Sequence, residues 1–96
     1  MDKLRTKEND ELFKAMLKLK SVDECYDFFE DLCTITEILA MSQRLSVAKL
    51  LKEKKSYVEI SKETGASAAT ISRVAKCLSY GRDGYNLILG RLEENK

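Results

Sequence analysis

The chain has 96 residues and a formal net charge of +1, from 17 Lys and Arg against 16 Asp and Glu. It has no proline, 4 glycines and much Leu, Lys, Glu and Ala, which favours an all-α fold and a single domain over residues 1–96. Because it has no histidine, it lacks the commonest general base and the usual nucleophile pairs, and we expect it not to be an enzyme.

The cysteine spacing argues against a metal-binding protein, and the hydropathy argues against a membrane protein. There are 3 cysteines, Cys25, Cys33 and Cys77, with no CxxC pair and no histidine to complete a zinc site, so we predict buried free thiols, no metal and no cofactor. No apolar run approaches the roughly 20 residues that span a bilayer. Residues 1–10 lack the apolar core of a signal peptide, so we expect no membrane association and a cytoplasmic protein.

The N-terminal part of the chain predicts two amphipathic helices. Residues 1–7 are polar and are expected to be disordered. Apolar residues at helical spacing predict a first helix over 9–20, and Ser21 with Glu24 has the form of a capping box at the start of a second helix. The carboxylates of this second helix are expected to form a solvated face rather than a metal site.

A third helix is predicted over residues 36–54, and its apolar residues surround the helix instead of lining one side. These residues are Ile38, Leu39, Met41, Leu45, Val47, Ala48, Leu50 and Leu51. A helix of this kind has to be buried on several faces. Since a 96-residue monomer has few other elements to cover it, we expect a second subunit to do so, giving a homodimer.

Residues 56–78 predict two short helices joined by a sharp turn. Ser56 with Glu59 has the form of a capping box, Gly65 is suited to ending the first helix, and Ser67 is suited to capping the second. This is the pattern of a helix-turn-helix, which places its second helix in the major groove of DNA. A turn over 79–84 and a final helix over 85–94 are predicted to follow.

The second helix of the motif has two distinct faces. Its apolar stripe consists of Ile71, Val74, Ala75 and Leu78, and its opposite face carries Ala69, Ser72, Arg73 and Lys76. Positive charge is concentrated around it, because residues 49–82 hold 8 Lys and Arg against 3 Asp and Glu, whereas residues 1–48 hold 7 against 10. Both features favour double-stranded DNA as the partner.

The predicted DNA-binding residues fall into two groups. Cations expected to contact phosphates are Lys54, Lys55, Lys62, Arg73 and Lys76, with Arg82 as a further candidate. The small residues Ala69 and Ser72 of the outer face are expected near the bases. An ordinary helical hairpin with a solvated face has the same pattern. The alternative function is a helical protein-interaction module that does not bind DNA and docks a partner through the acidic second helix or the final helix.

The order of the helices, with the two-helix motif fourth and fifth of six, and the run GASAATISR at residues 65–73 resemble the Trp repressor superfamily. More narrowly, the chain is similar to the bacterial Trp-repressor-like YerC/YecD family. The resemblance implies a transcriptional regulator that forms an intertwined homodimer, with two recognition helices in successive major grooves about 34 Å apart on a palindromic operator. It also implies that the DNA-binding residues at the start of the recognition helix are Ser67, Ala68, Ala69, Thr70 and Ser72.

The resemblance also implies a candidate effector pocket, at Arg44, Thr70, Arg73, Val74 and Cys77. In Trp repressor the residues that match Thr70 and Arg73 line the tryptophan site. A glycine packs against the indole there, whereas this chain has Val74, and a serine near the ligand amine is replaced by Cys77. We therefore predict that tryptophan does not gate this protein, and that either no small molecule or a different one does.

Overall fold

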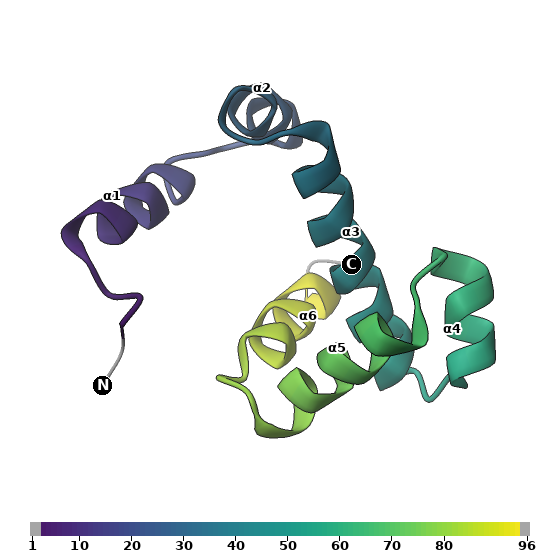
Figure 1. The fold of residues 1–96 in the computed structure, drawn as a ribbon. Helices are drawn as coiled ribbons and strands as arrows, with labels where there is room; N and C mark the ends of the chain where they lie inside the picture. The colour runs from purple at the N-terminus through teal and green to yellow at the C-terminus, as the bar shows by residue number, and fades with distance from the viewer. Residues whose placement is uncertain (1–2, 95–96) are drawn as a thin grey trace. The chain divides into compact units, whose positions relative to one another are not determined.

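The computed structural model describes residues 3–94, which form six α-helices and no strand (Figure 1). The all-α prediction is confirmed. The helices are α1 Lys7–Met16, α2 Val22–Leu32, α3 Ile35–Lys52, α4 Tyr57–Thr64, α5 Ala68–Tyr80 and α6 Gly84–Glu94. The chain divides into two compact units, Met1–Ile35 and Thr36–Lys96, and each is described by itself. The prediction of a single domain over 1–96 stays a prediction.

Helix α1 begins earlier and ends earlier than the predicted 9–20. The Thr6 side chain accepts a hydrogen bond from the Asn9 backbone N–H at 3.0 Å, and this cap starts the helix at Lys7. Lys7 is therefore helical, although 1–7 were predicted to be disordered; residues 1 and 2 of that segment lie outside the described residues. The helix ends at Met16 because the N–H of Lys18 bonds to the carbonyl of Ala15, which tightens the chain into a turn.

Helix α2 is capped by Ser21, as predicted, but its capping box is not closed in the usual way. The Ser21 side chain accepts from the Glu24 N–H at 3.0 Å, whereas the Glu24 carboxylate accepts from the Lys20 N–H at 2.9 Å and not from that of Ser21. No described side chain of α1 or α2 is buried. Phe28 and Phe29 form an edge-to-face pair with ring centroids 5.5 Å apart.

Helix α3 ends at Lys52, two residues before the predicted end. The N–H of Lys54 bonds to the carbonyl of Leu51 at 3.0 Å, and the N–H of Lys55 bonds to that of Leu50 at 3.1 Å. This pair of bonds closes the helix and holds Lys54 in the left-handed region, at a φ of 66°. The structure thus has a lysine where glycine is the usual residue.

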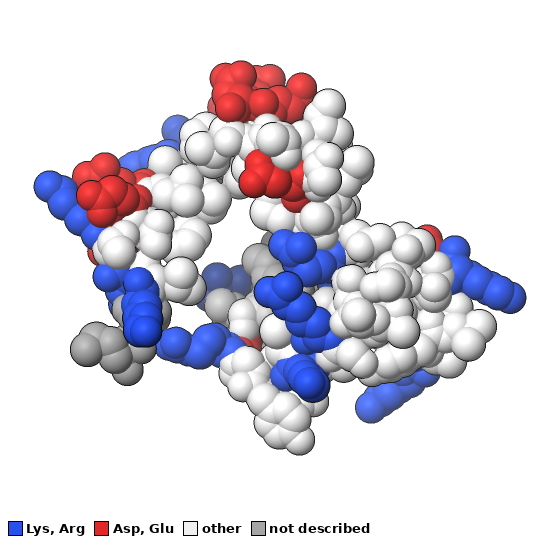
Figure 2. Space-filling model, viewed as in Figure 1, with Lys and Arg blue, Asp and Glu red and all other residues white. Residues whose placement is uncertain are grey.

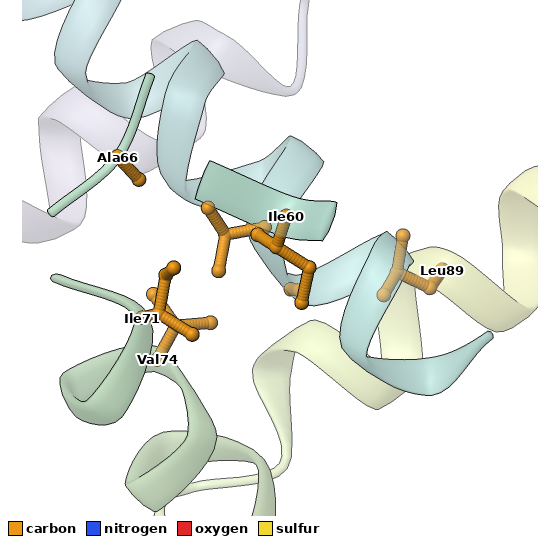
Figure 3. Packing of buried hydrophobic residues seen from close by; sticks show 7 residues of the cluster. Ile60, Ala66, Ile71, Val74 and Leu89 are labelled. Atoms are coloured by element: carbon orange, nitrogen blue, oxygen red, sulfur yellow. The ribbon is translucent and has the colours of Figure 1, made fainter. Parts of the chain in front are cut away.

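The core of the C-terminal unit is formed where α4, α5 and α6 pack around the C-terminal half of α3 (Figures 1 and 3). The buried residues are Val47 and Ala48 of α3, Ile60 of α4, Ala66 of the turn, Ile71 and Val74 of α5, and Leu89 of α6. Leu50, Leu51, Leu78 and Tyr85 pack against this cluster. The helix-turn-helix therefore packs against α3 through the apolar stripe that the sequence predicted for α5.

The connection between α5 and α6 is shorter than the predicted turn over 79–84. Helix α5 continues to Tyr80, where the N–H of Gly81 bonds to the carbonyl of Cys77 at 2.9 Å, and α6 begins at Gly84. Among residues 3–94, no helix is long and apolar enough to cross a membrane, and no group of acidic or cysteine side chains is arranged to hold a metal ion.

The cysteines are free thiols, as predicted, but they are not buried. Cys25 and Cys33 are half-buried and Cys77 is exposed. Cys77 lies on the flank of α5, between the buried Val74 and the exposed Arg73 around the helix.

Candidate nucleic-acid interface

The two helices of the motif meet at a turn closed by Gly65. This residue has a φ of 74°, in the left-handed region that a residue with a side chain rarely adopts, and its N–H bonds to the Ser61 carbonyl at 2.8 Å. Ser56 and Glu59 form the predicted capping box at the start of α4, with bonds of 3.1 and 3.3 Å. The local predictions for this turn are confirmed.

Side chains on both sides of the turn hold it in place. The Ser61 hydroxyl donates to the Ala66 carbonyl at 3.0 Å, and the Ala66 N–H donates to the Thr64 hydroxyl oxygen at 3.1 Å. Ala66 is only 2% exposed, so its methyl group anchors the turn in the core. The angle between α4 and α5 is therefore set by bonds within the turn as well as by packing.

Gln43 of α3 also holds the turn, and sequence reasoning missed it. Its side-chain amide donates to the Thr64 carbonyl at 3.1 Å. The carbonyls in the last turn of a helix have no partner within that helix, so this bond satisfies one of them. The position of Gln43 four residues before Val47 was a usable signal, because that spacing puts it on the face of α3 that packs in the core.

Asn86 of α6 fixes the other end of α5 and was also missed. Its amide donates to Asp83 Oδ1 at 2.7 Å and to the Leu78 carbonyl at 3.5 Å, and its oxygen accepts from Lys52 Nζ at 2.7 Å. Gln43 thus connects the end of α4 to α3, and Asn86 connects the last turn of α5 to α6.

Helix α5 turns one face to the core and the other to solvent. Ile71 and Val74 are each 1% exposed, and Ser67 caps the helix by accepting from the Thr70 N–H at 3.2 Å. The outer face, defined as Ala69, Ser72, Arg73 and Lys76, is exposed along its whole length. This face has the small residues near its N-terminal end and the cations further along.

The remaining predicted cations are exposed as well. Lys54, Lys55 and Lys62 all have exposed side chains, and Lys55 forms a weak ion pair with Glu59 at 4.0 Å. Figure 2 shows an uncharged surface over α4 and α5 with Lys and Arg side chains around it, whereas Asp and Glu gather over α2. The helix-turn-helix therefore has small, uncharged side chains at its centre and Lys and Arg side chains at its edge. Such a surface suits a nucleic acid, which has negatively charged phosphates and base edges that side chains can contact.

Comparison with known proteins assigns the family. A family model described as Trp repressor protein matches residues 7–93, which is most of the chain. The chain belongs to the Trp repressor protein family. Because this is a family of regulators, the chain is not an enzyme, as its lack of histidine predicted.

Relatives of the same family agree in sequence and structure. YerC of Bacillus subtilis strain 168, described as uncharacterized, is 55% identical over 96 residues, covering 100% of this chain and 92% of that protein. The crystal structure of a TrpR-like protein from Eubacterium eligens ATCC 27750 has 56% identity and a TM-score of 0.92, covering 95% of this chain and 94% of that one. The crystal structure of a protein from Staphylococcus aureus that is described as a Trp repressor has 53% identity and a TM-score of 0.92, covering 95% of this chain and 91% of that one.

The residues of the candidate effector pocket lie in different environments in this Trp repressor family member. Val74 is in the core, Arg44 and Thr70 are half-buried, and Arg73 and Cys77 are exposed. Two cavities, of about 300 and 570 Å³, lie against α3, one beside α6 and the other beside α4, and none of these five residues lines either cavity. The assignment of the five residues to an effector pocket stays a prediction.

Replacing Lys54 with glycine is expected to stabilise the protein and to weaken DNA binding. A left-handed conformation costs a residue with a side chain about 1–2 kcal/mol, part of which glycine regains. Thermal unfolding should show a midpoint higher by a few degrees, on the order of 4 °C. A Lys54→Gln variant, which loses the charge but keeps the strained backbone, should weaken DNA binding equally without this rise; equal midpoints for both variants would rule out the strain.

Proposed function

We propose that this member of the Trp repressor family is a sequence-specific, DNA-binding transcriptional regulator that acts in the cytoplasm as a homodimer. The observation that carries the proposal is the outer face of α5, which is exposed and cationic while its inner face is held in the core. A helix fixed in this way can enter a major groove without unfolding, with Arg73 and Lys76 placed to contact phosphates or base edges.

Exposed apolar side chains support the homodimer. In the N-terminal unit Leu17 is 84% exposed and Val22 is 72% exposed, and Leu39 of α3 is 63% exposed. Large apolar side chains such as these are mostly buried in folded proteins, and a second copy of the chain would cover them on both subunits at once. A dimer would also present two copies of α5 to a palindromic operator.

The burial of Val74 supports the proposal that tryptophan does not control the activity of this regulator. A side chain that is 1% exposed and packed with Ile60 and Ile71 fills the position at which a glycine of Trp repressor leaves room for the indole. The effector, where one is used, is then a different small molecule.

Selection of binding sites from random or genomic duplexes tests the proposal. We expect one reproducible palindromic sequence, bound by a particle of twice the 10.9 kDa chain mass in sedimentation. The five cations predicted to contact phosphates on each subunit, counted without the further candidate Arg82, give ten phosphate contacts in a dimer when all of them bind. The logarithm of the association constant should therefore fall with the logarithm of salt concentration at a slope between about −5 and −9.

The outcome also separates the alternative function. A protein-interaction module would enrich no sequence, and a weak affinity for DNA that does not depend on sequence would contradict the proposal in the same way.

A further inference from the structure

The two hydroxyl side chains at the start of α5, those of Ser67 and Thr70, form hydrogen bonds within that turn. The Ser67 oxygen accepts from the Thr70 N–H at 3.2 Å, and the Ser67 hydroxyl donates to Thr70 Oγ1 at 3.2 Å. Thr70 is half-buried, whereas Ser67 is exposed. Within residues 67–70, which the structure describes completely, the two polar side chains are therefore engaged with each other.

Between these two residues lie two exposed methyl groups. Ala68 and Ala69 are both exposed, and Ala69 lies on the outer face, opposite the buried Ile71. An alanine methyl neither donates nor accepts a hydrogen bond, so it distinguishes bases only by apolar contact. In the major groove the apolar group that differs between base pairs is the 5-methyl group of thymine.

We propose that Ala68 and Ala69 specify thymine in each operator half-site by contact with its 5-methyl group. This inference rests on the proposed function and narrows it to a class of DNA sequence. Hydrogen-bond readout is then left to Ser72 and Arg73, which are exposed on the outer face and carry donors. Each half-site is expected to contain thymine at the base pairs nearest the N-terminal end of α5.

Deoxyuridine, which is thymidine without the 5-methyl group, tests the contact at one thymine at a time. After an operator has been selected, each thymine of one half-site is replaced in turn by deoxyuridine, and affinity is measured by fluorescence anisotropy at fixed salt. We expect about fourfold weaker binding at one or two positions, the effect of one lost apolar carbon contact. Replacement elsewhere in the half-site should change the affinity little.

An Ala69→Gly variant links this effect to the protein. It removes the methyl group on the protein side, so it should bind thymine and deoxyuridine equally at the position that Ala69 contacts. Ser79→Gly is the matched control, because it also places glycine at an exposed position of α5 but near the other end, and it should keep the fourfold preference. Circular dichroism checks that both variants are folded.

The outcomes distinguish this inference from the proposed function. A selection that enriches no sequence overturns DNA binding and this inference together. An operator that tolerates deoxyuridine at every thymine, or an Ala69→Gly protein that still prefers thymine at the same position, overturns the methyl contact and leaves DNA binding in place.

Discussion

An Ala69→Glu variant is expected to bind the operator at least about 100-fold more weakly than the wild type while keeping its fold. Ala69 lies at the N-terminal end of the outer face of α5, so a carboxylate there would be desolvated against the phosphates and base edges of the groove. Juxtaposed like charges at an interface cost several kcal/mol, which corresponds to roughly this loss. Fluorescence anisotropy with the selected operator measures the affinity.

If α5 enters the groove by its N-terminal end, the loss of affinity should depend on where along the helix the new negative charge is placed. Ser79→Glu adds the same charge to the same helix, ten residues or about 15 Å further along, and should weaken binding by less than about tenfold. Both variants should have wild-type helix content, since both side chains are exposed. Wild-type affinity of Ala69→Glu, or equal losses in the two variants, would contradict this docking of α5.

Replacing Val74 with glycine is expected to destabilise the protein by about 3 kcal/mol and not to create a tryptophan site. The buried valine loses roughly 2 kcal/mol of apolar burial, and glycine within a helix costs about 1 kcal/mol more. This is a large share of the stability of a small domain. Urea unfolding at one protein concentration measures the change, because the stability of a dimer depends on concentration.

Two further variants isolate the contribution of burial. Val58 is 66% exposed on α4, so Val58→Gly should cost only about 1 kcal/mol. Val74→Ala avoids the helix-propensity cost of glycine and provides a milder test if Val74→Gly does not fold. Calorimetric titration should detect no tryptophan binding to wild type or Val74→Gly; a Val74→Gly protein that is stable and binds tryptophan would place Val74 in a ligand pocket after all.

Much of the helix-turn-helix was predictable because its determinants are close together in sequence. A cap is a bond between residues three apart, as between Ser56 and Glu59, and a helix end depends on one residue such as Gly65. The inner and outer faces of α5 followed from the helical repeat alone. The predicted helix ends were less accurate, since hydrogen bonds of turn residues such as Lys18 and Lys54 decide where a helix stops.

The sequence by itself thus determined the helix order, the caps, the turn and the two faces of α5, because each depends on interactions within one or two helical turns. Only the tertiary structure decided that Val74, which lies on the predicted apolar stripe, shares one core with Ile60 of α4, and that Gln43 and Asn86 bond to the end of α4 and the last turn of α5. The Gln43 bond joins residues 21 positions apart and the Lys52 to Asn86 bond joins residues 34 apart. Such contacts form only when α3, α4, α5 and α6 pack together, and no local pattern encodes that packing.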